Sequence, residues 1–220
     1  MNHRSHVSDA VVKRLPGYYR YLRELENSGI TRISSQELGA QMGLTASQIR
    51  QDINCFGGFG QQGYGYHVSE LKMRIAEILG LAQDYHVIIV GAGNIGRAVA
   101  NYPGFERDGF KVRAIFDVSS ALIGIEVHGV VVQPMEKLDA WLKNHQVDIA
   151  VLAVPADTAK LTFDYLVRGG VRGVWNFAPV DLSSEAGNVA VINVHLSDSL
   201  HILSYRLREQ QELSQQEQPQ

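Results

Sequence analysis

The sequence contains a single cysteine and no long hydrophobic run, and both absences exclude classes of protein. Cys55 cannot form a disulfide within the chain, and neither a Cys-x-x-Cys nor a His-x-x-x-His spacing indicates a zinc site. No apolar run approaches the roughly 18 residues that a membrane span needs, and the polar N-terminus lacks the apolar stretch of a secretion signal. We therefore expect a cytoplasmic protein with no metal site and no membrane partner.

The charge of the chain does not identify a partner. The net charge of −3 combines +2 over residues 1–80 with −5 over residues 81–220. An excess of two positive charges is a weak sign of nucleic-acid binding. The length of 220 residues fits a domain of about 80 residues followed by one of about 130.

Helical periodicity dominates residues 1–80. Apolar side chains first recur at steps of four and three residues, which predicts one helix, or two helical pieces that meet near Pro16, ending at Gly29. Capping-box spacing, in which Ser or Thr is followed three residues later by Glu or Gln, occurs at residues 34–37 and again at 45–48. Two helices should begin there, separated by a glycine turn, and together they predict a helix-turn-helix.

The second helix of this pair presents polar side chains outward, while Ile49 and Ile53 face inward. Arginine can pair with guanine through two hydrogen bonds, and Gln or Asn can do the same with adenine. A scaffold helix with one solvated face carries the same residue types, so this face alone leaves both interpretations open. The candidate DNA-binding residues of this segment are Arg32, Ser34, Ser35, Thr45, Ser47, Gln48, Arg50, Gln51 and Asn54.

Residues 56–66 contain five glycines with interleaved aromatic residues. This composition predicts a hairpin wing, because glycine lets a backbone approach a phosphate closely and aromatic side chains can pack the hairpin on the helices. A flexible linker is the alternative, although linkers favour serine and avoid aromatic residues. We expect Gly60, Gln61 and Gln62 to lie at the DNA, and a further helix over residues 69–80 to lead into the second domain.

The second domain opens with a strand and a glycine-rich turn. An apolar run over residues 86–90 is followed at once by Gly91-Ala92-Gly93-Asn94-Ile95-Gly96. Gly-x-Gly-x-x-Gly alone is weak evidence, since glycine-rich loops are common. Here a helical segment follows, and a second apolar run ends at Asp117, 21 residues after Gly96, where the acid that accepts the ribose hydroxyls is expected. The combination predicts a Rossmann domain that binds a dinucleotide.

Each glycine of this motif has a physical role. Gly91 makes the tight turn, Gly93 lets backbone amides approach the pyrophosphate, and Gly96 lets the helix pack closely on the strand. Asp117 would repel a 2′-phosphate, and the residues from Val118 onward offer no arginine to bind one. The expected cofactor is therefore NAD(H) rather than NADP(H).

Strands and helices alternate through the rest of this domain, which predicts an α/β fold with a Rossmann-like, doubly wound parallel sheet. Further strands are expected at residues 130–132, 149–154, 174–177 and 189–194, and helices at 135–143 and 158–167. Apolar residues follow two of these strands, where such sheets bind ligands, and they suit a nicotinamide ring. The candidate cofactor-binding residues are Gly91, Ala92, Gly93, Asn94, Ile95, Gly96, Asp117, Val118, Val154, Pro155, Phe177, Ala178 and Pro179.

The C-terminal segment favours a regulator over an enzyme. Leucines at steps of four, three and four predict one helix that begins at Leu196. A dehydrogenase usually has an additional domain for its second substrate, and no such domain is evident, so we expect no catalytic residues. The expected domains are a winged-helix domain at 1–80, a Rossmann domain at 81–195, a C-terminal helix at 196–209 and a disordered Gln-rich tail at 210–220.

Short motifs along nearly the whole chain point to one known family. They are Arg14-Leu15-Pro16-x-Tyr18-Tyr19-Arg20-Tyr21-Leu22, Ser34-Ser35, Gln48-Ile49-Arg50, Phe56-Gly57-x-Phe59-Gly60, Gly63-x-Gly65-Tyr66, Gly91-x-Gly93-Asn94-Ile95-Gly96, Asn101-Tyr102-x-Gly104-Phe105, Phe116-Asp117, Asn176-Phe177-Ala178-Pro179 and Ile202-Leu203-Ser204-Tyr205. In this order they closely resemble the Rex family of redox-sensing transcriptional repressors.

The resemblance implies a homodimer in which each C-terminal helix is swapped onto the partner subunit. It further implies that two winged helices bind an inverted-repeat operator, and that NADH binding releases the DNA. By the same resemblance, Tyr102 lies near the nicotinamide and belongs with the cofactor-binding residues. Arg20, Tyr102 and His195 are then expected to couple the two domains.

Some positions depart from the family's usual pattern. Gln51 and the pair Gln61-Gln62 stand where basic residues are usual, and the loss of three charges per subunit should weaken phosphate binding and flatten its salt dependence. Cys55 stands where an aromatic residue is usual. His195 replaces an aspartate, and a protonated histidine would repel Arg20. Two alternatives stay open: an NADH-binding paralogue with weakened DNA binding, and a small NAD-dependent oxidoreductase with His195 as its acid or base.

Overall fold

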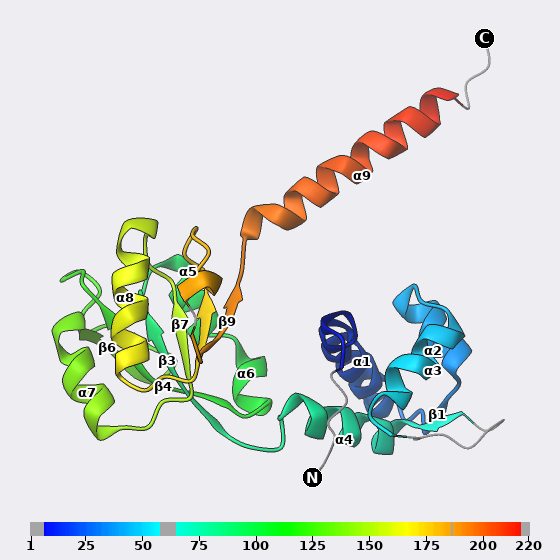
Figure 1. Ribbon diagram of the computed structural model, residues 1–220, viewed down its shortest axis with the longest axis horizontal. Helices are drawn as coiled ribbons and strands as arrows, with labels where there is room; N and C mark the ends of the chain where they lie inside the picture. The colour runs from blue at the N-terminus through cyan, green and yellow to red at the C-terminus, as the bar shows by residue number, and fades with distance from the viewer. Residues whose placement is uncertain (1–6, 58–64, 186, 217–220) are drawn as a thin grey trace. The chain divides into compact units, whose positions relative to one another are not determined.

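The chain divides into two compact units, Met1–Gln83 and Asp84–Gln220, each with its own hydrophobic core (Figure 1). The computed structural model describes residues 7–57, 65–185 and 187–216. Among these residues no helix is both long enough and apolar enough to cross a membrane. No group of three or more His, Cys, Asp or Glu side chains suited to a metal ion occurs in the same described part of the chain.

The first unit is built around one long helix. Its elements are α1 (Asp9–Asn27), β1 (Arg32–Ile33), α2 (Ser35–Met42), α3 (Ala46–Asn54), β2 (Tyr66–His67) and α4 (Val68–Leu79). Helix α1 passes through Pro16 without a break, so of the two alternatives the single helix is correct. Pro16 is exposed, where a carbonyl without its helical partner can bind water. The apolar face of α1 is buried in the core of this unit.

Both expected capping boxes are present. Ser34 and Glu37 cap α2 reciprocally, Thr45 and Gln48 cap α3 in the same way, and Gly43 ends α2 in the left-handed conformation at φ 65°. The predicted helix-turn-helix is therefore confirmed.

The two short strands of this unit form one antiparallel pair. Ile33 pairs with Tyr66, so the strand after the glycine-rich segment joins the strand that precedes α2. The wing is predicted over residues 56–66, and its residues 58–64, which include Gly60, Gln61 and Gln62, lie outside the described residues.

The second unit contains a seven-stranded sheet in the order β5-β6-β4-β3-β7-β8-β9. The strands are β3 (Tyr85–Val90), β4 (Phe110–Asp117), β5 (Glu126–Val127), β6 (Val130–Pro134), β7 (Ile149–Leu152), β8 (Gly173–Asn176) and β9 (Ala190–Asn193). All neighbours are parallel except β5 and β6. Numbered without β5, the order is that of a Rossmann sheet, with the reversal between β3 and β7.

Among the described residues of this unit, one strand and one α-helix did not appear in the sequence-based prediction. One is the antiparallel edge strand β5, which joins β6 through His128 and Gly129, both with positive φ (49° and 78°), as a tight hairpin turn requires. The other is the short helix α6 (Pro103–Arg107). Neither is long enough to give a periodic pattern.

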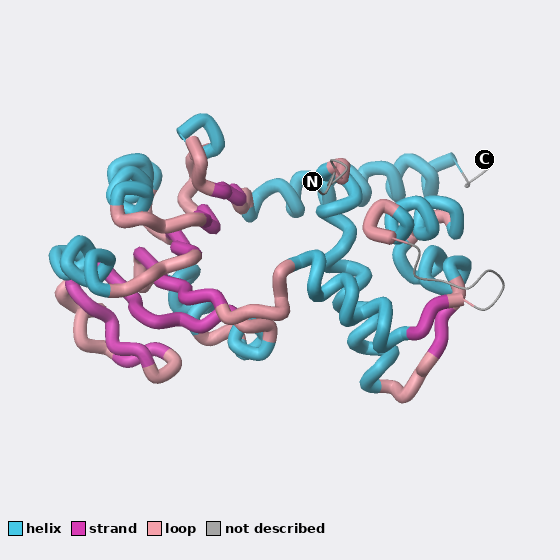
Figure 2. The backbone as a smooth tube through the Cα atoms, turned by 60° about the horizontal axis from the view of Figure 1, so that its bottom comes forward, coloured by secondary structure: helices cyan, strands magenta, loops and turns pink. Residues whose placement is uncertain are grey.

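Helices cover both faces of the sheet (Figure 2). Helices α7 (Leu138–Asn144) and α8 (Ala156–Arg168) bury one face together with Ile88 and Val90 of β3. Helix α5 (Asn94–Ala100) packs on the other face, toward which Val87 and Ile89 point. In the described part of the connection from β8 to β9, the regular structure is the 3-10 turn Ser183–Glu185. An apolar groove of about 420 Å³ lies on the α5 side over β3, β7, β8 and β9.

Helix α9 (Leu196–Gln216) is longer than expected. It continues seven residues past Glu209, so the expectation of a disordered tail from residue 210 is wrong for residues 210–216. Gln, Glu and Leu are good helix formers, and neither Gly nor Pro occurs between Leu196 and Pro219. Every described side chain of α9 is exposed.

The glycines of the turn after β3 allow a matched test. A Cβ on Gly96 would lie 1.8 Å from the Gly91 carbonyl oxygen, whereas a Cβ on Gly93 would meet nothing within 4 Å. We expect Gly96→Ala to destabilise the fold by about 1–3 kcal/mol, despite alanine's higher helix propensity, and Gly93→Ala to change stability by less than about 0.5 kcal/mol. Chemical denaturation measures both, and equal stabilities would contradict the close contact between α5 and the turn.

Candidate cofactor-binding and DNA-binding sites

The turn between β3 and α5 has the geometry expected of its glycines. Gly91 has φ 99°, and a Cβ there would lie 2.2 Å from the Ala153 carbonyl oxygen beyond β7. Gly96 has no room for a Cβ beside Gly91, so α5 packs directly on the turn. Gly93 is open on the side where a Cβ would stand, so a ligand can approach its backbone.

A cleft of about 720 Å³ opens at this turn. It lies at the carboxyl ends of β3, β4 and β7, where the strand order reverses and sheets of this kind bind dinucleotides. Its volume is within the range of ligand pockets. The residues that line it are Val90, Gly91, Gly93, Phe116, Asp117, Val118, Leu122, Met135, Ala153, Val154, Pro155, Asp157, Thr158, Leu161, Thr162 and Tyr165.

The Asp117 carboxylate is held in a fixed orientation at this cleft. One oxygen accepts the backbone N–H of Ala92 (2.5 Å), and the other accepts the backbone N–H of Ser119 (2.7 Å). A carboxylate offers about four lone-pair sites, so two backbone donors leave capacity for two hydroxyl donors. Asp117 is thus tied to the glycine turn and can still accept hydrogen bonds from a ligand.

The structure brings some predicted cofactor residues to the cleft and leaves others outside its lining. Gly91, Gly93, Asp117, Val118, Val154 and Pro155 line it. Ala92, Asn94, Ile95, Gly96, Phe177, Ala178 and Pro179 do not, although the last three directly follow β8, the strand beside β7. Their contact with a cofactor stays a prediction.

Tyr102 also lies outside the lining of the cleft. It follows the C-terminal end of α5, about 10 Å along that helix from its first turn. The residue is 57% exposed, and its ring packs on Phe105, with 4.7 Å between ring centroids. Arg20 and His195 are exposed residues of different units, so the expected coupling among the three residues also stays a prediction.

Helix α8 supplies part of the cleft that the sequence analysis missed. Asp157, Thr158, Leu161, Thr162 and Tyr165 line the cleft from this helix. They recur at helical spacing, but on a helix that also carries the buried face formed with Phe163 and Leu166. The helical spacing of these residues is visible in the sequence, but only the fold shows that this face of α8 borders a cleft.

The polar face of α3 that is predicted to contact DNA bases is exposed. Ser47, Gln48, Arg50, Gln51 and Asn54 all have exposed side chains, while Ile49 and Ile53 are buried. Arg50 donates a hydrogen bond from Nη1 to Ser35 Oγ (3.0 Å), which joins α3 to the start of α2. This face is a continuous polar surface.

Gln48 departs from its expected role. Its Oε1 accepts hydrogen bonds from the backbone N–H (3.0 Å) and the hydroxyl (3.2 Å) of Thr45. Paired recognition of adenine uses both the oxygen and the nitrogen of a glutamine amide, and here the oxygen is engaged in the cap. In this conformation Gln48 stabilises the start of α3 and cannot make the paired contact with a base.

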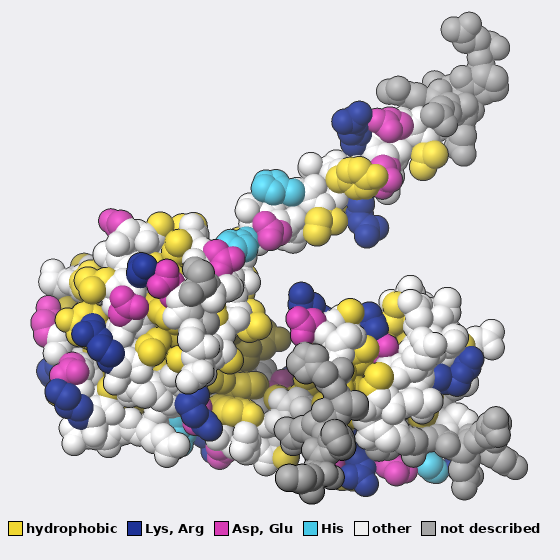
Figure 3. All heavy atoms as spheres, in the orientation of Figure 1, with side chains coloured by type: hydrophobic (Ala, Val, Ile, Leu, Met, Phe, Trp, Pro, Cys, Tyr) yellow, Lys and Arg dark blue, Asp and Glu magenta, His cyan; other side chains and the backbone are white. Residues whose placement is uncertain are grey.

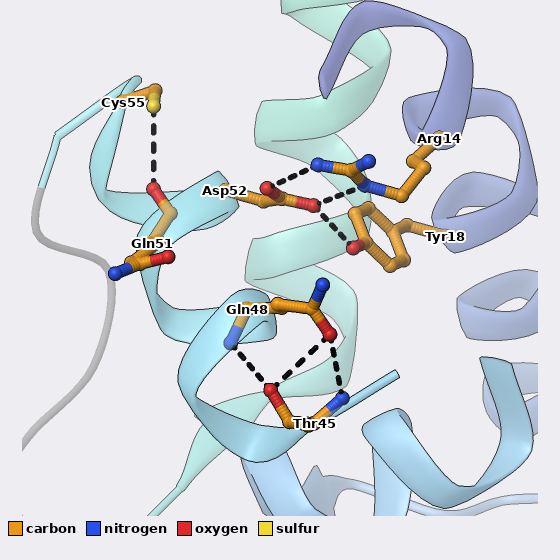
Figure 4. A network of polar contacts seen from close by, with 7 residues as sticks. All are labelled: Arg14, Tyr18, Thr45, Gln48, Gln51, Asp52 and Cys55. Carbon is orange, nitrogen blue, oxygen red and sulfur yellow. Dashed lines mark hydrogen bonds and ion pairs between the residues drawn. The ribbon is translucent and has the colours of Figure 1, made fainter. Parts of the chain in front are cut away.

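A buried ion pair holds the opposite side of α3, and the sequence analysis did not identify it. Asp52 Oδ1 and Oδ2 accept hydrogen bonds from Arg14 Nη2 and Nε (both 2.7 Å), and Oδ2 also accepts one from Tyr18 Oη (2.6 Å), as Figure 4 shows. The Asp52 side chain is 4% exposed. Burial acts to raise the pKa of Asp52, but the hydrogen bonds from Arg14 and Tyr18 outweigh it and hold that pKa below its ordinary value. Helix α3 is therefore fixed to α1 by three charge-assisted hydrogen bonds.

Comparison with known proteins follows the same division into two parts. A family model described as a putative DNA-binding protein N-terminus matches residues 6–54, and one described as a CoA binding domain matches residues 82–180. The redox-sensing transcriptional repressor Rex of Caldanaerobacter subterraneus subsp. tengcongensis is 51% identical over 211 residues, which are 96% of this chain and 94% of that protein. Rex of Clostridium beijerinckii is 53% identical over 209 residues, 95% of this chain and 99% of that protein.

Solved structures of RSP, a Rex-family repressor, are similar over nearly the whole chain. RSP in complex with β-NAD+ and operator DNA has a TM-score of 0.87 and 49% identity, covering 96% of this chain and 97% of that chain. RSP in complex with β-NADH has a TM-score of 0.88 and 46% identity, covering 97% of this chain and 100% of that chain.

A helix-turn-helix unit followed by a Rossmann unit with an open dinucleotide-type cleft defines a ligand-responsive transcription regulator. The chain belongs to the Rex family of redox-sensing transcriptional repressors. This membership confirms the resemblance drawn from the motifs, and it places the chain among repressors rather than enzymes.

The ion pair of Asp52 predicts a pH-dependent stability. Because its folded-state pKa is below the unfolded value of about 3.9, its contribution is present above about pH 4 and is lost as pH falls through the folded pKa. At neutral pH we expect Asp52→Asn to destabilise the protein by about 3 kcal/mol, the lower end for a broken buried pair, since Arg14 is 30% exposed and can reach water.

Tyr18→Phe is the matched control, because it removes one hydrogen bond and leaves the ion pair in place. It should cost about 1.5 kcal/mol. Denaturation curves at several pH values provide the measurement. A stability difference between Asp52→Asn and wild type that does not shrink in acid would show that the carboxylate is not paired as described.

Proposed function

We propose that this protein is a homodimeric repressor that binds an inverted-repeat operator and releases it when NADH binds. The cleft at the glycine turn, with Asp117 oriented at its edge, is the observation on which the proposal rests. It is supported by the complexes of the related RSP with β-NAD+ and operator DNA and with β-NADH. Because its target is DNA, we infer that it works in the cytoplasm.

The cofactor would lie across the carboxyl ends of β3, β4 and β7. The pyrophosphate would meet the backbone at Gly91 to Gly96, and Asp117 would accept the ribose hydroxyls. Val118 would lie against the adenosine half, and Val154, Pro155 and the segment Phe177 to Pro179 would contact the nicotinamide. These apolar strand ends favour the neutral dihydronicotinamide over the cationic oxidised ring, because burying an unpaired charge is costly.

DNA would be read by α3 and supported by the residues around it. Arg50 is the candidate for a paired contact with guanine, and Gln51 and Asn54 lie on the same exposed face. Arg32, Ser34, Ser35, Thr45 and Ser47 are candidates for phosphate contacts, which fix the register of the protein on the duplex. Gly60, Gln61 and Gln62, which lie outside the described residues, are further candidates for contact with DNA.

A swapped C-terminal helix would complete the dimer. Exposed apolar side chains run along α9, including Leu196, Leu200, Leu203 and Leu207 (Figure 3). The groove over β7 to β9 is lined by apolar side chains such as Trp175 and Ile192. Two exposed apolar surfaces on one chain favour association with a second copy, and α9 of the partner is the occupant we propose for the groove.

The proposal requires reciprocal coupling between the two ligands. NADH and operator DNA should each weaken the binding of the other by the same factor, because binding free energies are linked. A factor of about 100 corresponds to about 2.7 kcal/mol of coupling. NADH affinity is measured with and without saturating operator, and operator affinity with and without saturating NADH.

NAD+ is the control ligand in these titrations, and it should change operator affinity far less than NADH does. If NADH affinity is the same with and without operator, the two domains are uncoupled and the sensor function is wrong, even when both ligands bind.

Cofactor selectivity tests the role of Asp117. Asp117→Ala should weaken NADH binding by about 10- to 100-fold, as expected for the loss of hydrogen bonds to a charged group, and should reduce discrimination against NADPH. Asp117→Asn keeps an acceptor for a backbone N–H and removes the charge, so it should lose discrimination with a smaller loss of NADH affinity. Fluorescence titration measures both; a wild-type NADH/NADPH ratio in both variants would remove Asp117 from the site.

A further inference from the structure

Two asparagines at the ends of β8 and β9 form a side-chain pair that the proposed cofactor and DNA contacts do not use. Asn176 is the last residue of β8 and is 0% exposed, and Asn193 is the last residue of β9. Asn176 Nδ2 donates a hydrogen bond to Asn193 Oδ1 (2.8 Å). The backbone N–H of Val194 donates to the Asn176 carbonyl oxygen (2.8 Å) beside them.

Asn176 closes the loop that follows β8. Its Nδ2 also donates to the Val180 carbonyl oxygen (2.7 Å), and its Oδ1 accepts the backbone N–H of Ala178 (3.0 Å). The loop so closed contains Phe177, Ala178 and Pro179, the residues proposed to contact the nicotinamide. The conformation of this loop is therefore set by the Asn176 amide.

Asn193 uses its whole amide in the same network. Oδ1 also accepts the backbone N–H of Leu182 (3.3 Å), while Nδ2 donates to Asp181 Oδ1 (3.0 Å) and to Ser183 Oγ (2.8 Å). Rotating the amide by 180° would place its nitrogen against two donors and its oxygen against a carboxylate. The orientation of Asn193 is thus fixed by its neighbours.

Asn193 also lies next to α9 along the chain. Val194 and His195 are the two residues between Asn193 and Leu196, the first residue of α9. A shift of the loop after β8 that moved Asn176 would break or displace the hydrogen bonds of Asn193. Asn176 is buried and Asn193 is half-buried, and because a hydrogen-bonded amide pair tolerates few alternative arrangements, such a shift would move the end of β9 with the loop.

We propose that Asn193 is a positioning residue that transmits the state of the loop after β8 to the start of α9, and so carries part of the coupling between cofactor and DNA. This inference rests on the proposed function, since it assumes that NADH binds at that loop and that α9 contacts the partner subunit. Asn193 touches neither ligand in this assignment; it acts through Asn176 on one side and through the start of α9 on the other.

An exchange of amide and carboxylate tests the proposal. Asn193→Asp keeps the size of the side chain but places two carboxylates together at Asp181. Asp181→Asn is the matched control, because its amide oxygen can still accept from Asn193 and the backbone N–H of Ser183. The double variant Asn193→Asp/Asp181→Asn removes the repulsion between the two carboxylates, although the Asp181 oxygen that Asn193 binds also accepts the backbone N–H of Ser183.

The measurement is the coupling factor, the ratio of operator affinities without and with saturating NADH, in full-length protein. Starting from a wild-type factor of about 100, Asn193→Asp should lower it at least about tenfold, while NADH affinity without DNA and operator affinity without NADH each stay within about threefold. Asp181→Asn should keep the wild-type factor, and the double variant should recover most of it. A general loss of stability would instead lower both single affinities.

The outcomes are distinguishable from failure of the proposed function. If wild-type protein shows no coupling, the proposed function itself fails. If wild type is coupled and Asn193→Asp keeps the same coupling factor, the role of Asn193 is overturned. Should Asn193→Asp not fold, Asn193→Ala decides instead, because it removes the amide without adding a second carboxylate: a coupling factor at least about tenfold below wild type supports the proposal, and a wild-type factor contradicts it.

Discussion

The close contact between helix α5 and the end of β3 is the constraint on which the second unit depends. Gly96 has no space for a Cβ beside the Gly91 carbonyl, and Gly91 has none beside Ala153 at the end of β7. Helix α5 and the ends of β3 and β7 are thereby held together where the strand order reverses. Asp117, hydrogen-bonded to Ala92, adds the end of β4 to this group. The cleft exists because backbones meet here without side chains between them.

The first unit depends on a different kind of interaction. Its apolar core fixes which faces of the helices are inside, but apolar contacts alone tolerate small rotations of a helix. The Asp52 carboxylate, bound by Arg14 and Tyr18, gives α3 one position relative to α1. Buried ion pairs often add little net stability while favouring one arrangement. Arg50 and Gln51, on the far side of α3, are presented to solvent by this arrangement.

The second unit leaves two apolar surfaces exposed in the single chain. Helix α9 exposes leucines along its length, and the sheet has an apolar groove where a crossover helix would normally lie. The amide pair of Asn176 and Asn193 lies between the loop that follows β8 and the start of α9. We proposed above that the cofactor signal passes through this hydrogen-bonded pair of side chains to α9, the helix proposed to contact the partner subunit.

Local patterns determined much of this protein. The capping boxes, the glycine turn with Asp117 and the strand-helix alternation each depend on residues close in sequence, so they could be read directly, and the motifs identified the family. Tertiary structure decided the partners of Asp52, the α8 wall of the cleft, the engagement of Gln48 in its cap and the pairing of Asn176 with Asn193. These depend on which side chains are brought together when distant segments pack. Sequence periodicity describes one segment at a time and gives no distance between residues of different segments.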